Sequence, residues 1–488
     1  MYSFFRFNQS HLFAFYILWD TIEYFKQIMA CRKGRNIMNA STTKIDMLQG
    51  PLTKKLLLFT LPIALSSMLQ QLFNAADTSI VGYFDNADSL AAVGTNGEII
   101  ALIVSLSSGL SIGANVRIAS RIGQKRTDQI SQIVHTTITL AAILGIIGLL
   151  LGQGITRPLL TLIQTPDEIL PSAELYLRIY FLGYPFLLLY DFASAILRAR
   201  GDSRYPFFAL TLSGMVNVLL NLVFVILLKL SVAGIALATV LSTGLSAMML
   251  LHRLQKDPGE FHLSWKKLHL DRADLTQILK IGVPSAIQGA VFCFANIFVQ
   301  ASVNSFGAIA IAGSTIAMNF EYFTYYIITA FGQTATTFVS QNYAAKQYKQ
   351  CRKILWLCMG YSTLFSMLMI EPIVVFRSGL SGLFSTEPAV IQNAGIRVMC
   401  ILFFEPLCNL YEIAAGVLRG TGHSLLPAAI TVLGTCAFRI IWICTIFRQH
   451  PQLEVLYAAF PISWVITTIL MLGSLVILYP FRPNALSD

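Results

Sequence analysis

The sequence is poor in charge. Only 12% of its 488 residues are Asp, Glu, Lys or Arg, whereas soluble domains carry about 25%. Hydrophobic residues make up 55% of the chain, and the mean hydropathy is +0.66. These values exclude an ordinary soluble protein and indicate an integral membrane protein. The net charge of +10 then reflects the Lys and Arg of cytoplasmic loops, and we expect no nucleic-acid partner.

Residue clusters that would hold a metal or a cofactor are also missing. The eight cysteines contain no CxxC pair and the histidines are scattered, so neither a disulfide framework nor a zinc site follows. P-loop and HExxH motifs are absent, as is the DDxxD-like site of an integral-membrane transferase. The sequence therefore predicts no enzyme, no metal and no cofactor.

Long apolar runs separated by short polar stretches dominate the chain. Each run is long enough to cross a hydrocarbon core of about 30 Å, and none alternates as barrel strands do. We therefore predict an all-α integral membrane protein with twelve transmembrane helices embedded in the lipid bilayer. The segments lie near 56–82, 90–116, 130–152, 173–196, 206–228, 234–251, 281–305, 308–340, 354–376, 390–418, 427–447 and 457–478.

The loop charges predict the orientation. Loops after the even-numbered segments hold most of the Lys and Arg. Those after the odd-numbered segments hold only Arg157, Lys229, Arg377 and Arg448. Because basic residues accumulate on the cytoplasmic side, we place the even loops and both termini in the cytoplasm, and the chain in the cell membrane.

Residues 1–50 form an extension ahead of the first segment. The stretch "HLFAFYILWDTIEYF" contains Asp20 and Glu23, so it is too short and too charged to span a membrane. One interpretation is an interfacial amphipathic helix. The preferred one is that the natural start is Met38 and that the residues before it are not native.

The two halves of the chain resemble each other. Pro62 matches Pro284, and "ILRARGDSRYP" (196–206) matches "VLRGTGHSLLP" (417–427) at a nearly constant offset. Six segments per half give both halves the same orientation, so two six-helix bundles form a parallel internal repeat. We expect the binding site in the cleft between the bundles. The predicted parts are an N-lobe (51–251), a cytoplasmic linker (252–280), a C-lobe (281–480) and a tail (481–488).

Four stretches resemble the multidrug and toxic compound extrusion (MATE) family. They are "NAADTSIVGYFDNADSLAAVG" (74–94), "GANVRIASRIGQK" (113–125), "LRARGDSRYP" (197–206) and "VNVLLNLVFV" (216–225). The resemblance implies two lobes, alternating access, and export driven by H⁺ or Na⁺. The wider superfamily also contains flippases for lipid-linked saccharides.

Asp77 is the only charge between Lys55 and Asp85. With Ser67, Gln70 and Asn74 it recurs at helical spacing, so the four residues share one helix face. A central charge in lipid costs about 2.5–3.5 kcal/mol, so this face must line a polar cavity, where burial favours the neutral acid.

The resemblance identifies Asp77 as the family's coupling acid. Asn74, one helical turn away, is its expected hydrogen-bond partner. The alternative is a structural Asp that holds helices together.

A second polar face lies on segment 206–228, where Asn217 and Asn221 are one turn apart. Many relatives carry an Asp at the position of Asn221. One hypothesis is that Asp191, on the preceding helix, replaces it as a coupling residue; the alternative is that Asp191 is hydrated near the cytoplasmic mouth. Its neighbour Tyr190 is a candidate for the substrate cavity.

The C-terminal half has further intramembrane charges, which are candidates for the substrate cavity. Arg439 needs an anionic partner or water. One interpretation is a structural ion pair with Glu405 or Glu412. The other is that these residues form a substrate or cation site. Glu321 is the remaining acid. Segment 281–305 lacks the acid of sodium-coupled relatives, so H⁺ is favoured over Na⁺.

Together these features predict a secondary active antiporter. It would export amphipathic organic compounds in exchange for H⁺ or Na⁺ by alternating access, and we expect it to be a monomer. Arg439 is the clearly intramembrane base, and several intramembrane acids outnumber it. This excess of acids favours a cationic cargo. The alternative is a flippase for a lipid-linked saccharide.

Overall fold

The computed structural model describes residues 44–85, 87–163 and 165–478. The predictions for residues 1–43 and for the tail 481–488 lie outside these described residues. The described helices belong to the second of two compact units, Ile45–Asp488. Within the described ranges the regular structure is entirely helical, with no strand, which confirms the predicted all-α class.

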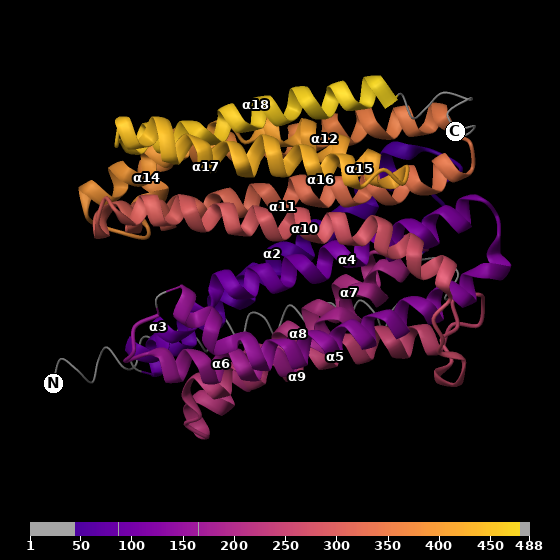
Figure 1. The fold of residues 1–488 in the computed structure, drawn as a ribbon, viewed down its shortest axis with the longest axis horizontal. Helices are drawn as coiled ribbons and strands as arrows, with labels where there is room; N and C mark the ends of the chain where they lie inside the picture. The colour runs from indigo at the N-terminus through magenta and orange to yellow at the C-terminus, as the bar shows by residue number, and fades with distance from the viewer. Residues whose placement is uncertain (1–43, 86, 164, 479–488) are drawn as a thin grey trace, which may run out of the picture. The chain divides into compact units, whose positions relative to one another are not determined.

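The first half of the chain forms the N-lobe (Figure 1). Its helices are α2 (Leu52–Phe84), α3 (Ala87–Thr95), α4 (Gly97–Gly123), α5 (Ile130–Leu162), α6 (Leu170–Leu182), α7 (Tyr184–Ala199), α8 (Arg204–Leu222) with the π-helical turn η2 (Val223–Leu227), and α9 (Ser231–Gln255).

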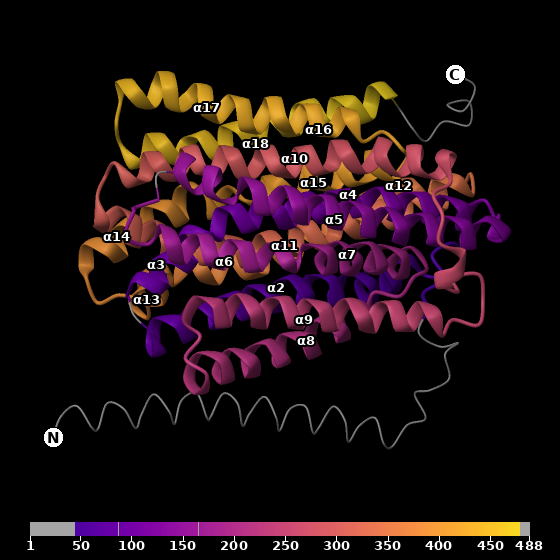
Figure 2. The same ribbon diagram turned by 60° about the horizontal axis from the view of Figure 1, so that its bottom comes forward.

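The second half forms the C-lobe, whose helices are best separated in Figure 2. They are α10 (Arg272–Asn304), α11 (Ala308–Ala344), α12 (Tyr348–Val375), α13 (Arg377–Gly382), α14 (Pro388–Cys400), η4 (Leu402–Phe404), α15 (Pro406–Gly420), α16 (Leu425–Thr431), the π-helical turn η5 (Val432–Ala437), α17 (Phe438–Trp442), the π-helical turn η6 (Ile443–Phe447) and α18 (Leu453–Leu478). Each predicted segment coincides with one helix or one broken helix.

Nine helices of the described part are long and apolar enough to cross a membrane, and eleven do so if each bent pair is one span. The bends are 44° between α6 and α7 and 43° between α14 and α15, each beside a proline near the start of the second helix, where the missing N–H costs least. The remaining predicted span is α11, which is 37 residues long. It is less apolar because it packs between the two lobes, where polar side chains find partners.

The predicted linker 252–280 is too long. α9 continues to Gln255 and α10 begins at Arg272, so the connection covers only residues 256–271. Arg253 and Lys280 therefore belong to helices. Basic side chains predicted to lie in a loop lie instead on helix ends that extend past the apolar span.

The first helix of each lobe begins in the core of the other lobe. Leu56, Phe59 and Ile63 of α2 are buried in a cluster whose other members, apart from Met47 and Ala64, are C-lobe side chains. Conversely, Ile278 of α10 is buried in the core of the N-lobe. This exchange places α2 and α10 at the junction of the lobes, in agreement with their related positions in the predicted repeat.

Helices α4 and α10 cross with their backbones in contact. A Cβ on Gly113 would lie 2.0 Å from the carbonyl oxygen of Ile278, and one on Gly282 would lie 2.6 Å from that of Leu110. Small residues allow this close approach, which is the usual way that helices associate in membranes. The crossing joins the N-lobe directly to the C-lobe.

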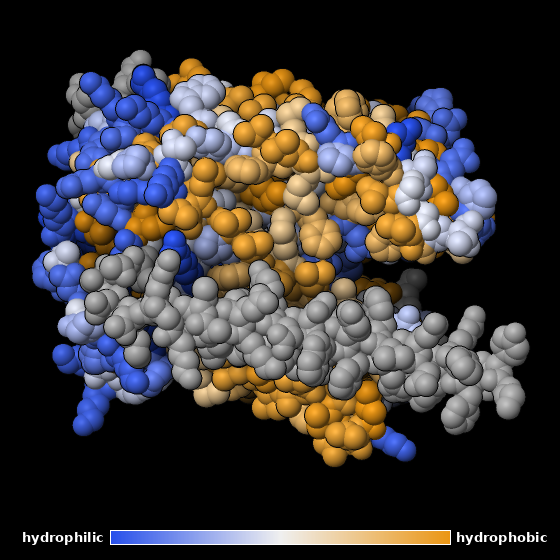
Figure 3. Space-filling model, turned by 180° about the vertical axis from the view of Figure 1, so that it is seen from behind, coloured by the Kyte–Doolittle hydropathy of each residue, from blue (hydrophilic) through white to orange (hydrophobic). Residues whose placement is uncertain are grey.

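An apolar band runs across the surface between two more hydrophilic ends, as Figure 3 shows. Exposed aliphatic side chains of the long apolar helices include Leu150, Leu151, Ile469 and Val476. A band of exposed aliphatic residues is what lipid contact requires.

A methyl group added at the α4–α10 crossing should destabilise the protein. We expect Gly113→Ala to lower the free energy of unfolding by about 1–3 kcal/mol, the usual cost of overpacking, because its Cβ meets the Ile278 backbone. The melting temperature of the purified protein in detergent measures the change. Gly154→Ala is the matched control, since a Cβ there meets nothing within 4 Å. Equal effects of the two substitutions would contradict this packing.

Candidate functional site

Asp77 lies inside the N-lobe, where three helices meet. Its side chain is only 8% exposed, and Oδ1 accepts a 2.5 Å hydrogen bond from Nδ2 of Asn221 on α8. The same Nδ2 also donates to Oδ1 of Asn217 at 3.3 Å, and Asn217 donates to Thr239 of α9 at 3.4 Å. No basic residue in the described part of the chain forms an ion pair with Asp77. The acid is therefore buried among neutral amide and hydroxyl groups.

The hydrogen-bond partner predicted for Asp77 was wrong. Asn74 lines an open cavity together with Gln71, Thr78 and Asn319, whereas Asp77 points to α8. The two residues lie on neighbouring but separate faces of α2, because the helix passes between the rest of its own lobe and α11. Ser67 and Gln70 are more exposed than Asp77, and neither lines one of the two cavities described here, contrary to their predicted place in the substrate cavity.

Asp191 belongs to a different network. Its Oδ2 accepts a 2.6 Å hydrogen bond from Ser107 of α4, and no hydrogen bond within the described ranges links it to Asp77 or Asn221. Tyr190 is buried and donates to the carbonyl of Pro206 at 3.3 Å. It lines neither of the two cavities described here, contrary to its predicted place in the substrate cavity.

Two buried ion pairs neutralise predicted C-lobe acids. Arg397 makes a two-pronged contact with Glu321, at 2.7 and 2.8 Å, and donates to Ser314 at 2.7 Å. Arg419 pairs with Glu412 at 2.7 Å. Paired geometry of this kind offsets the desolvation of both charges.

The ion pair predicted for Arg439 was therefore wrong on both counts. Glu412 is held by Arg419, and Glu405 accepts a short hydrogen bond from Thr324. Arg439 is 1% exposed. Its Nε donates to Ser463 at 3.2 Å, and its Cζ lies 3.9 Å from the centre of the Phe460 ring. Both Nη atoms lack a partner among the described residues.

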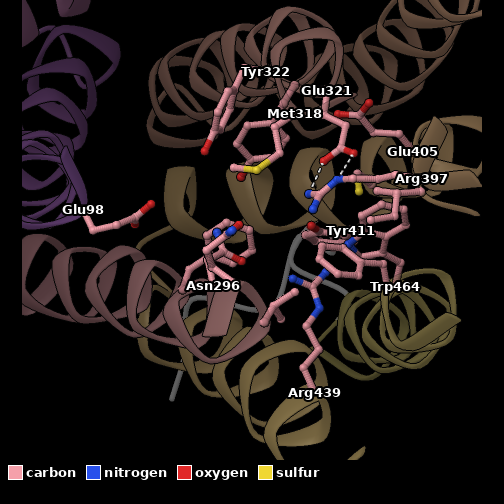
Figure 4. Close-up of a pocket in the computed structure, with 17 residues that line it drawn as sticks. Glu98, Asn296, Met318, Glu321, Tyr322, Arg397, Glu405, Tyr411, Arg439 and Trp464 are labelled. Carbon is pink, nitrogen blue, oxygen red and sulfur yellow. Dashed lines mark hydrogen bonds and ion pairs between the residues drawn. The ribbon is translucent and has the colours of Figure 1, made fainter. Parts of the chain in front are cut away.

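One cavity of about 100 Å³ is lined by Glu321, Arg397, Glu405 and Arg439 together (Figure 4). Glu98 of α4 faces it from the N-lobe side, and Arg439 points into it from the opposite side. Its lining comprises Glu98, Phe292, Asn296, Val299, Gln300, Met318, Glu321, Tyr322, Tyr325, Arg397, Ile401, Glu405, Cys408, Tyr411, Arg439, Phe460 and Trp464.

Sequence reasoning missed three residues of these sites. Glu98 is the only charge in the predicted segment 90–116, so the argument used for Asp77 would have found it. Arg397 lies near the start of the predicted segment 390–418, where a basic residue is ordinary, yet it is buried. Thr239 gave no signal, since a lone Thr in an apolar helix is ordinary.

The chain matches known proteins along most of its length. The family model described as MatE matches it twice, at residues 62–223 and 284–444. The probable multidrug resistance protein YoeA of Bacillus subtilis is 26% identical over 425 residues, covering 85% of this chain and 92% of the relative. The multidrug export protein MepA of Staphylococcus aureus is 22% identical over 429 residues, covering 88% and 92%.

A solved structure shows the same fold. It is an outward-facing multidrug resistance MATE family transporter of the MOP superfamily, and it superposes with a TM-score of 0.83 at 20% identity, covering 91% of this chain and 100% of that one. The two matches of one family model fall on the two halves in which the repeat was recognised. The chain therefore belongs to the multidrug and toxic compound extrusion (MATE) family of membrane proteins, as the sequence predicted.

Proposed function

We propose that this protein is a secondary active antiporter that exports amphipathic organic compounds in exchange for H⁺. The observation that carries the proposal is the burial of Asp77 in the N-lobe without a basic partner in the described structure. A carboxylate held by neutral groups can bind and release a proton, whereas an ion pair with Arg keeps a carboxylate in its ionised form. Relatives named as multidrug proteins support export of organic compounds.

The groups around Asp77 suit both of its protonation states. The ionised form accepts a hydrogen bond from Asn221 Nδ2. The carbonyl oxygen Oδ1 of the same Asn221 side chain is buried and has no partner among the residues that the structure describes, so it is available to accept from a protonated Asp77. Because a buried acceptor without a donor is unfavourable, this oxygen lowers the cost of the neutral state.

Alternating access is supported by where the lobes are joined. Inter-lobe hydrogen bonds connect Thr60 with Thr334 at 2.8 Å, Asn115 with Thr337 at 2.9 Å, and Gln341 with the Ala199 carbonyl at 2.6 Å. With the predicted orientation, these contacts lie in the cytoplasmic half and both cavities lie in the outer half. We infer that export requires these contacts to open while the outer side closes.

The proposed cargo carries a positive charge. Glu98 faces the C-lobe cavity, and aromatic side chains in its lining suit cation–π contact. The number of intramembrane acids does not itself favour cationic cargo, because Arg397 and Arg419 neutralise two of these acids. The flippase alternative has less support, since Glu321 cancels the charge of Arg397 and, of the two basic residues that line this cavity, only Arg439 lacks an ion pair within the described structure.

Replacing Asp77 should uncouple transport from protons. We expect Asp77→Asn to reduce efflux of a cationic dye from vesicles with an imposed pH gradient to the level of vesicles without protein, because the amide binds no proton. Dye binding to the purified variant should persist. A sodium gradient should drive no efflux in the wild type. Proton-driven efflux by the variant, or sodium-driven efflux by the wild type, would contradict the proposal.

Asp191→Asn is the matched comparison, because Asp191 is also an intramembrane acid. We expect pH-driven efflux close to wild type, since the asparagine side-chain oxygen still accepts from Ser107 and the Asp77 network is untouched. The same vesicle assay measures it. Loss of coupling in this variant with retained coupling in Asp77→Asn would move the coupling site to Asp191.

A further inference from the structure

Arg439 is a buried cation that the protein leaves incompletely satisfied. It is 1% exposed, and only its Nε has a hydrogen-bond partner in the described structure, Ser463 at 3.2 Å. The rings of Phe460, Trp464 and Phe292 lie around its Cζ at 3.9, 5.8 and 5.8 Å. Aromatic faces stabilise the positive charge, but they do not take the place of in-plane acceptors for the Nη hydrogens.

The unpartnered Nη atoms belong to a group that lines the C-lobe cavity. Figure 4 shows the guanidinium pointing into this space towards Tyr411. Buried donors without acceptors are rare in proteins and call for an explanation. The nearby acids do not supply one, because Glu321 is held by Arg397 and Glu405 accepts from Thr324.

The helix around Arg439 is irregular on both sides. The short helix α17 lies between two π-helical turns, η5 (Val432–Ala437) and η6 (Ile443–Phe447). Such turns are frequent at functional sites. Each π turn holds one more residue than an α turn, so η5 rotates Arg439 relative to a regular continuation of α16.

The internal repeat places residues of this cavity at positions equivalent to those of the Asp77 site. The Asp77 site contains an isolated acid, and the cavity contains the isolated base Arg439. The offset from Pro62 to Pro284 also takes Asn74 to Asn296 and Asp77 to Val299, and both of these C-lobe residues line the cavity. The acid of the N-lobe is thus replaced by an apolar residue.

The base has a counterpart as well. The sequence offset from Pro206 to its repeat mate Pro427 is one residue shorter than the offset from Pro62 to Pro284. The π turn η5 follows Pro427 and adds one residue, so the longer offset applies again after it. Arg439 then corresponds to Asn217, the neighbour of Asn221 in the Asp77 network.

We infer that Arg439 is an oxyanion-binding site of the C-lobe cavity and that it takes the carboxylate of an aromatic substrate. A carboxylate matches the two free Nη donors, which present a planar fork. The aromatic lining suits a flat ring system, and Glu98 on the far side suits a cationic group of the same compound. The inference deepens the proposed function by specifying a zwitterionic substrate class.

A pair of probes that differ only in the carboxylate tests this site. The cavity of about 100 Å³ calls for small probes: one is a zwitterionic single-ring fluorescent dye with an ammonium group and a free carboxylate, and the other is its cationic methyl ester. Fluorescence anisotropy of the purified full-length protein in detergent gives both affinities without any ion gradient. Arg439→Gln should weaken binding of the carboxylate dye about tenfold or more, the usual effect of losing a charged hydrogen bond. Binding of the ester should be unchanged.

Two further variants complete the test. Arg439→Lys keeps the charge and should retain part of the preference for the carboxylate dye. Arg448→Gln removes the same charge from an exposed position and should change neither affinity. Equal weakening of both dyes by Arg439→Gln would assign Arg439 a structural role and overturn the inference. No change with either dye would mean that water serves the guanidinium, which also overturns it.

Failure of this binding test and failure of the proposed function are distinguishable. The coupling role of Asp77 is read from gradient-driven efflux, whereas selectivity at Arg439 is read from equilibrium binding. If the wild type binds only the ester, the oxyanion site is wrong and cation export stands. If the carboxylate preference depends on Arg439 but no gradient drives efflux, the site stands and the antiport proposal fails.

Discussion

Hydrocarbon offers no partner to a charge, and this constraint decides where every ionisable side chain of the membrane region lies. A charge at the centre of a bilayer costs about 2.5–3.5 kcal/mol even on the most lenient scale. The protein meets this cost with close ion pairs at Arg397–Glu321 and Arg419–Glu412. At Asp77 and Arg439 it does not, and both side chains are held by neutral groups. Asp191 and Glu405 are likewise held by hydroxyl groups rather than by a base.

The repeat explains how one scaffold presents both kinds of site. α2 and α10 begin in the opposite lobe and place equivalent positions around two internal spaces. In the N-lobe those positions carry an acid and amides, and in the C-lobe they carry an apolar residue, an amide and a base. Two related bundles thus carry an isolated acid in one and an isolated base in the other without any change of fold.

The junction between the lobes has two chemically different parts. The α4–α10 crossing brings backbones together over glycines, which is a contact that tolerates no added atoms. The bonds between α2 or α4 and α11 join Thr and Asn side chains. Water competes well for such groups once they are exposed, whereas it does not compete for close backbone packing. The polar contacts are therefore the part of the junction best suited to open and close.

The amino-acid sequence by itself determined the helical segments, their grouping into two related halves, and the presence of an isolated acid at Asp77. Each of these depends on the hydrophobicity of about 20 consecutive residues or on a pattern repeated along the chain. The tertiary structure alone decided which charges meet: Asp77 with Asn221 rather than Asn74, Glu412 with Arg419, and Arg439 with aromatic rings rather than an acid. It also decided that α11 packs between the lobes. Such pairings depend on the rotation and crossing of helices far apart in sequence, and a one-residue π turn such as η5 is enough to change which face a side chain occupies.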